Sequence, residues 1–218
     1  MKRIAEVVEE LVLAAPLLED GLGAGIINLS ALARRLKPAI ESALMKDVSE
    51  ASVMMALRRL SPVLARRRRA ERTHLKRIGE LTVRSDLVAL TFQNSDTVWE
   101  RQKRLLHRLE RASGSFLTYT QGALEVMLIV SAVLEERALA AFRSEKLLSR
   151  LSRLSAIVIR LSPTTVDTPG VYYTILKRLA WNNLNVVDVV STRTEFTVVV
   201  DTSDIERAFA ILRRYLWS

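Results

Sequence analysis

The sequence predicts an α+β protein in which a small helical bundle precedes two copies of a strand–helix–strand–strand–helix unit with antiparallel sheets. Three observations lead to this fold class. Apolar residues recur at helical spacing over residues 1–60, strand-like alternation begins at residue 81, and the same order of elements then returns after about 70 residues. Of the 218 residues, 49% are hydrophobic, which is enough for a packed core.

In the bundle, helices are predicted over residues 3–14, 28–37 and 49–60. Asn28 and Ser49 stand at the start of apolar-periodic runs and are the expected N-caps. Pro38 is expected to break or restart the second helix, because proline lacks the N–H that a helix interior needs. The last two helices are only loosely helix-turn-helix-like, since their connection is longer than the short turn of that motif.

Residues 61–80 are predicted to form a basic helix that connects the bundle to the first repeat. Ser61 and Pro62 favour a helix start there, because proline is tolerated in the first turn. The run Arg66, Arg67, Arg68 and Arg69 permits two interpretations. The arginines clamp phosphates, with DNA as the candidate partner, or they form a solvated face with their stems on apolar surface. No base-contacting set accompanies them, so no sequence specificity is predicted.

The two repeats are assigned to residues 81–145 and 150–218. In the first repeat the pattern predicts strand, helix, two strands and helix at residues 86–92, 96–112, 115–121, 123–132 and 134–142. In the second repeat the same order falls at residues 154–161, 169–182, 184–191, 195–201 and 203–216. Each copy is close to the lower size limit of a stable domain, so we expect the copies to pack on each other or on a second chain.

The second repeat carries Pro169-Gly170, then the helix 171-VYYTILKRLA-180, then 184-LNVVDVVST-192 and 197-TVVVD-201. In these features it resembles an ACT domain, a ferredoxin-like βαββαβ-type regulatory module, and it is most similar to the paired ACT domains of aspartate kinase. The first repeat keeps 120-TQG-122 but has 94-NSDTVWE-100 instead of the Pro-Gly start. Asn183 stands where the family usually has glycine, and asparagine is the next-best residue for a left-handed C-terminal cap.

The resemblance places an effector site where the loop before the first helix meets the following strand. The residues it implies are Asp167, Thr168, Pro169, Gly170, Val171, Asn185 and Val186. Amide N–H groups at the helix start attract a carboxylate, Gly170 lets a ligand approach the backbone, and Asp167 could accept an ammonium group. An α-amino acid supplies both charges, and lysine, threonine and the branched-chain amino acids all fit the family. Alternatively, the Pro-Gly pair is plain helix initiation.

Enzyme chemistry has little support in the composition. Cysteine is absent and His74 and His107 are the only histidines, so we predict no metal, no cofactor and no catalytic residues. The segment 21-GLGAG-25 does not follow a predicted strand, so a phosphate loop is not indicated and kinase activity is not implied. The apolar run 126-VMLIVSAVL-134 is far shorter than the roughly 20 residues of a spanning helix, which favours a cytoplasmic protein with no membrane partner.

Two functional hypotheses remain. In the first, the chain is a non-catalytic regulator that senses an amino acid through its ACT repeats, and its basic helical region acts on DNA or on a partner protein. In the second, the repeats bind no ligand and serve as a dimerisation or interaction module that docks on an amino-acid biosynthetic enzyme. Both hypotheses expect a homo-oligomer, most simply a dimer. The net charge of +9 favours anionic partners in either case.

Overall fold

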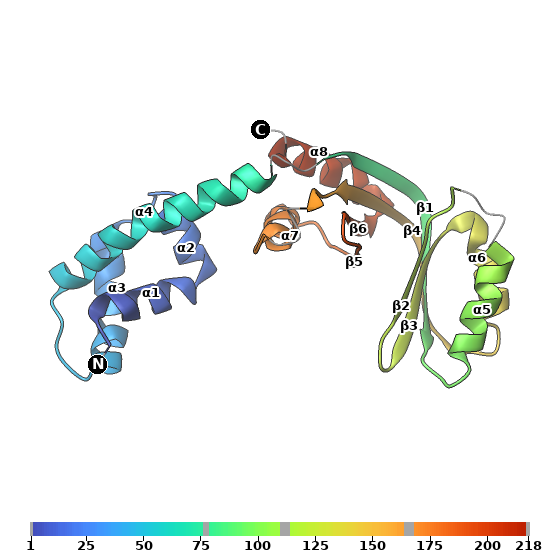
Figure 1. The fold of residues 1–218 in the computed structure, drawn as a ribbon, viewed down its shortest axis with the longest axis horizontal. Helices are drawn as coiled ribbons and strands as arrows, with labels where there is room; N and C mark the ends of the chain where they lie inside the picture. The colour runs from blue at the N-terminus through green and yellow to red at the C-terminus, as the bar shows by residue number, and fades with distance from the viewer. Residues whose placement is uncertain (1, 76–78, 110–113, 164–167, 217–218) are drawn as a thin grey trace. The chain divides into compact units, whose positions relative to one another are not determined.

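The computed structural model describes residues 2–75, 79–109, 114–163 and 168–216 and contains two compact units, Met1–His74 and Leu75–Ser218 (Figure 1). The first unit is helical, and the second combines helices with an antiparallel sheet. The predicted mixture of helices and antiparallel sheet is therefore confirmed. In the described part of the chain, no helix is both long enough and apolar enough to cross a membrane.

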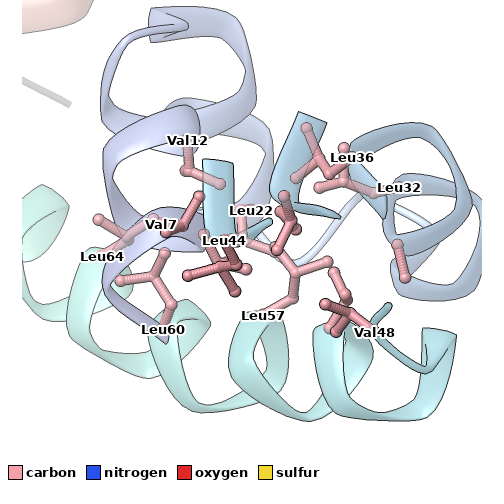
Figure 2. Close-up of a cluster of buried hydrophobic side chains, with 14 residues drawn as sticks. Val7, Val12, Leu22, Leu32, Leu36, Leu44, Val48, Leu57, Leu60 and Leu64 are labelled. Atoms are coloured by element: carbon pink, nitrogen blue, oxygen red, sulfur yellow. The ribbon is translucent and has the colours of Figure 1, made fainter. Parts of the chain in front are cut away.

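The N-terminal unit consists of α1 (Ile4–Leu13), α2 (Pro16–Gly23), α3 (Leu29–Leu44) and α4 (Glu50–Leu75). Their apolar faces meet in one core, which Figure 2 shows with Leu57, Leu60 and Leu64 of α4 beneath α1 and α3. Gly23 brings α2 close to α4, because a Cβ added at this residue would lie 3.2 Å from the backbone carbonyl carbon of Leu64. The glycines of 21-GLGAG-25 thus serve helix packing in part.

Asn28 and Ser49 are N-caps, as predicted. The Asn28 side-chain oxygen accepts a hydrogen bond from the Ala31 N–H at 3.1 Å, and the Ser49 hydroxyl accepts one from the Ser52 N–H at 3.2 Å. Each bond satisfies a donor that the first turn of a helix leaves without a helical partner.

The two predictions made from prolines are wrong. Pro38 lies inside α3 and Pro62 lies inside α4, so neither breaks nor starts a helix. Both prolines are exposed, and the residue four positions before each, Arg34 or Arg58, is exposed as well. A carbonyl on the solvent side of a helix can bond to water when the proline offers no N–H, and the buried residues on either side of each proline keep the helix on the core.

The C-terminal unit contains the predicted order of elements twice. The first set is β1 (Leu81–Gln93), α5 (Val98–Leu109), β2 (Leu117–Gln121), β3 (Glu125–Ser131) and α6 (Glu135–Ala141). The second set is β4 (Leu147–Arg160), α7 (Val171–Trp181), β5 (Asp188–Ser191), β6 (Glu195–Asp201) and α8 (Ile205–Leu216).

The six strands form one continuous sheet, with the order β2-β3-β1-β4-β6-β5, and do not form two separate sheets. The long strands β1 and β4 pair with each other at its centre, and each extends beyond its own repeat. Asp86 and Arg153 adopt left-handed backbone angles, φ 55° and 57°, where the pairing between these strands is irregular. The second half of β1 pairs with β3, and the second half of β4 pairs with β6.

Side-chain alternation gives the sheet two different faces. On one face, α5 and α6 cover β1 and β3, while α7 and α8 cover β4 and β6 (Figure 1). On the opposite face, residues of both repeats bury one another in a smaller cluster. Its six buried members come from equivalent positions of the two repeats, namely Leu87 and Leu154, Ala89 and Ala156, and Ile129 and Val199. Because Leu87 and Leu154 are also direct cross-strand partners, a local twofold relation between the repeats passes between them.

Candidate functional site

The start of α7 is an open helix N-terminus. Gly170 is its N-cap residue, with φ +86°, and as a glycine it provides no side-chain hydrogen bond to the first turn. The Gly170 carbonyl accepts hydrogen bonds from the Thr174 N–H at 2.9 Å and from the Thr174 hydroxyl at 2.8 Å, which fixes the first turn. Gly170 is exposed, and a Cβ added there would meet no heavy atom within 4 Å. The Gly170 backbone is therefore held in place, and none of the described residues fills the space beside its Cα.

The other predicted site residues lie near this helix start to different degrees. Val171 is buried in the core cluster of the second repeat, and Val186 packs against the same cluster. Thr168 is half-buried, while Pro169 and Asn185 are exposed. Asp167, the predicted acceptor of an ammonium group, lies outside the described residues. The structure therefore places Val171 and Val186 on one core and leaves the role of Asp167 a prediction.

The predicted strand at residues 184–191 is shorter in the structure, where β5 begins at Asp188. Asn185 and Val186 are thus not strand residues, and that part of the prediction is wrong. The cause is the end of α7. The Leu184 N–H returns to the Leu179 carbonyl at 3.1 Å, and pairing with β6 starts only with the Val187 N–H on the Val199 carbonyl at 2.8 Å.

The end of α7 confirms the predicted role of Asn183. This residue has φ 53°, and its N–H donates to the Ala180 carbonyl at 3.0 Å while Leu184 donates to Leu179. Two such bonds around a left-handed residue form a Schellman motif. Leu179 and Leu184 are both buried in the same core, as that motif favours. The connection to the following segment is therefore fixed by local hydrogen bonds and by packing.

The equivalent helix start in the first repeat, that of α5, is closed by a carboxylate from the same unit. Glu145 accepts hydrogen bonds from the Ser95 hydroxyl at 2.6 Å, the Thr97 hydroxyl at 2.6 Å and the Arg101 Nε at 2.9 Å. The Glu145 side chain is only 5% exposed and that of Arg101 only 16%. The hydroxyls of the turn before α5 are thus one part of a larger polar cluster that ends on Glu145.

The pKa of Glu145 is lowered from its ordinary value. Burial by itself raises it, but the hydrogen bonds from Ser95, Thr97 and Arg101 together with the charge of Arg101 outweigh burial. Glu145 was not singled out from the sequence, because it lies 44 residues beyond Arg101 and no local pattern links them. The available signal was a glutamate in the polar segment directly before β4, which reads equally well as a solvent-exposed turn.

The predicted arginine run lies in the second half of α4. Arg66, Arg67 and Arg69 are exposed and Arg68 is half-buried. At 3.6 residues per turn, Arg66 and Arg69 fall on the side opposite the buried residues of this helix. Arg58 and Arg59 fall on the same outward side and are exposed. Residues 51–69 contain no acidic side chain, so every charged residue on the outward face between Arg58 and Arg69 is positive.

Metal chemistry gains no support from the described ranges, where no group of three or more histidine, aspartate or glutamate side chains could hold an ion. The predictions of no metal and no cofactor remain predictions.

No protein-family model matches the sequence, and neither does any curated protein. Solved structures do match. Aspartate kinase from Clostridium acetobutylicum superposes with a TM-score of 0.53 at 14% identity, over 64% of this chain and 35% of that one. The ligand-free regulatory subunit of aspartate kinase from Thermus thermophilus superposes with a TM-score of 0.51 at 10% identity, over 64% of this chain and 98% of that one.

This is the fold of aspartate kinase regulatory domains. The matched share is too large for residues 1–74, so it is the C-terminal unit that carries the likeness. The chain spans about a third of the length of the full kinases it resembles and nearly all of the regulatory subunit. Aspartokinase III from E. coli, whose structure holds lysine and aspartate, also superposes, with a TM-score of 0.51 at 12% identity over 65% of this chain and 34% of that one. At such identities the likeness shows the fold alone.

Proposed function

We propose that this chain is a non-catalytic regulatory protein whose second repeat binds an amino acid at the start of α7. The observation that carries the proposal is the contrast between the two repeats. The N-cap residue of α7, Gly170, provides no side-chain cap, and an added Cβ there meets no heavy atom of the described residues within 4 Å. At the start of α5, by contrast, the Ser95 and Thr97 hydroxyls already bind the carboxylate of Glu145. A helix N-terminus favours an anionic group, and the carboxylate of a free amino acid is such a group.

The proposed effector is an α-amino acid because it carries both charges that suit the start of α7. The carboxylate of the amino acid would accept hydrogen bonds from the N–H groups of the first turn, and its ammonium group would pair with Asp167. The half-buried Val186 would contact the side chain of the effector. Aspartokinase III from E. coli, which has a similar fold, was solved in complex with lysine and aspartate, which makes amino acids the first ligands to test. The resemblance favours lysine, threonine and the branched-chain amino acids.

The test is a thermal-shift scan of the full chain against the twenty amino acids, followed by two glycine variants. One or a few amino acids should raise the melting temperature, since a ligand that binds only the folded state stabilises it. Gly170→Trp should abolish that shift by filling the free space. Gly114→Trp is the matched control, because Gly114 also has φ +86° and also has no heavy atom within 4 Å of an added Cβ. An equal ligand shift in both variants would place the site elsewhere.

If no amino acid shifts the melting temperature, the proposal fails and the interaction-module hypothesis gains. That hypothesis has an observation of its own in the exposed rings on the first helices of the two repeats. Trp99 on α5 is 61% exposed and Trp181 on α7 is 57% exposed. Large exposed aromatic residues are common in protein–protein interfaces. Light scattering of the wild type and of Trp99→Ser and Trp181→Ser would show whether either ring holds two chains together.

The outward face of α4 favours a nucleic-acid output for the regulator. Phosphate contacts by Arg58, Arg59, Arg66 and Arg69 would give binding that weakens steeply as salt rises. Titrating a DNA duplex against the full chain at increasing salt tests this, with Arg66→Gln/Arg69→Gln against the lateral pair Arg67→Gln/Arg68→Gln. If the outward pair of substitutions reduces DNA affinity more than the lateral pair, the outward face of α4 contacts the DNA. Equal reductions would mean that only the net charge of the chain matters.

A further inference from the structure

A groove in the helical unit combines an apolar floor with a cationic rim. It has a volume of about 760 Å³ and is lined by the N-terminal start of α1, by the α3–α4 connection and by the first half of α4. Ile4, Ala51, Met55 and Ala56 provide the apolar surface, and Lys2, Arg3, Lys46 and Arg59 provide the charges. None of the described residues that line it is acidic. The groove belongs to residues 1–74 alone and is separate from the effector site.

The rim charges differ in how far they are already paired. Lys2 forms an ion pair with Glu10 at 2.8 Å, and Arg3 forms one with Glu6 at 2.6 Å, both at exposed positions. The side chains of Lys46 and Arg59 have no hydrogen bond or ion pair with any described residue. Two cations are thus available beside the apolar floor, and exposed pairs such as those of Lys2 and Arg3 exchange partners at little cost.

Two methionine side chains are exposed on or beside the apolar part of this surface. Met55 is 43% exposed, although its neighbour Met54 packs against the core. Met45, next to the rim residue Lys46, is 89% exposed and has φ 52°, a conformation that favours glycine or asparagine. Methionine is adaptable and is over-used at surfaces that bind helical segments. Neither side chain belongs to the buried core of the bundle.

We infer that this groove binds an acidic amphipathic helix of a partner protein. Such a helix would lay its apolar stripe on Met55 and its neighbours and place carboxylates on Lys46 and Arg59. Charge complementarity selects an acidic partner, and the apolar floor selects a helix over a nucleic acid, since a phosphate backbone gains nothing from Met55 or Ala51.

The experiment uses the full chain and a labelled alanine-based peptide of about 16 residues, long enough to be helical, with leucines on one face and glutamates on both flanks. Fluorescence anisotropy should show saturable binding that weakens between about 50 and 500 mM salt. Lys46→Glu/Arg59→Glu should weaken it about tenfold or more. Arg34→Glu/Arg35→Glu makes the same change in charge at two exposed α3 positions outside the groove and should leave it nearly unchanged.

The apolar floor is tested without any change in charge. Met55→Ser should weaken peptide binding about fivefold, and a peptide with its leucines replaced by glutamine should not bind. Equal binding of the glutamine peptide would overturn the inference, as would the absence of any binding by the leucine peptide. A DNA duplex that displaces the peptide, with no effect of Met55→Ser on either ligand, would identify a general polyanion surface instead. Because every variant is scored by binding of a peptide, failure here leaves the effector proposal standing.

Discussion

The two repeats of the C-terminal unit begin their first helices in opposite ways. In the first repeat, Ser95, Thr97 and Arg101 at the start of α5 converge on the buried carboxylate of Glu145. In the second, the N-cap of α7 is Gly170, which has no side chain to cap the helix, and an added Cβ there meets no heavy atom of the described residues within 4 Å. The same topology therefore supports a closed structural junction in one copy and an accessible helix N-terminus in the other.

The difference between the two helix starts shows two ways in which a negative charge can be supplied to a helix N-terminus. The N–H groups of a first turn favour a negative charge whether it comes from the chain or from a ligand. An external carboxylate at α5 would have to displace Glu145 and leave Arg101 without its partner. At α7 no such competitor is present among the described residues. The comparison predicts binding at the second repeat and not at the first.

Removing the closing carboxylate should have the largest effect. Glu145→Ala leaves the mostly buried Arg101 unpaired, which should reduce the free energy of unfolding by about 3 kcal/mol and the melting temperature by about 6–12 °C. Glu100→Ala is the control, because its ion pair with Lys103 is exposed on both sides and should contribute less than about 1 kcal/mol. Similar losses in the two variants, measured by urea denaturation, would show that Glu145 does not hold the first repeat closed.

The pH dependence of stability should report the same carboxylate. The pKa of Glu145 is lowered in the folded state, so its stabilisation is complete above the unfolded pKa of about 4.3 and is lost as the pH falls through the lower folded pKa. Glu145→Gln binds no proton at this position. The loss of stability between neutral pH and about pH 3 should therefore be smaller in this variant than in wild type. Parallel curves for the two proteins would contradict the assignment.

Gly170 should show a moderate effect that is separate from ligand binding. Because φ is +86°, Gly170→Ala should destabilise the ligand-free chain by about 1 kcal/mol even though its Cβ meets nothing. Gly170→Asn should cost less, since asparagine tolerates left-handed angles. Equal costs in urea denaturation would mean that backbone strain does not decide this position.

Asn183 should give the smallest effect. Asn183→Gly should leave stability unchanged or raise it by a few tenths of a kcal/mol, while Asn183→Val should lower it by about 1 kcal/mol, because a β-branched residue is strained at φ 53°. Thermal melting curves of the glycine and valine variants, each compared with wild type, test this expectation. A neutral valine variant would show that the Schellman motif adds nothing beyond the packing of Leu179 and Leu184.

Local signals in the sequence predicted most helices and strands correctly. Features that depend on contacts between distant segments were not predicted. The caps at Asn28 and Ser49 and the left-handed Asn183 are decided within a few residues, so pattern and chemistry sufficed. The prolines misled because tolerance of proline depends on whether the carbonyl four residues earlier faces solvent. That depends on how the helices pack, which a local pattern does not contain.

The candidate site was also predicted where local chemistry decides it and missed where distant contacts decide it. The turn chemistry of Pro169-Gly170 pointed to the helix start, and the structure gives Gly170 the left-handed angle that makes glycine useful there. Asn185 and Val186 were wrongly predicted to be strand residues. The hydrogen bonds that end α7 extend to Leu184, so pairing with β6 begins only at Val187. Glu145 was missed because its partners lie 44 to 50 residues away.

The shared sheet has a consequence for how the unit breaks down. Each of β1 and β4 continues past its own repeat to lie beside the other, so half of each long strand would lose its only pairing if the repeats were separated. Expressing the two repeats as separate fragments, divided between residues 145 and 147, would leave unpaired strand edges and exposed leucines on both. Each fragment should therefore aggregate or associate with the other. The two repeats are expected to exchange their amide hydrogens as a single cooperative block, in which a ligand at one end slows exchange at the other.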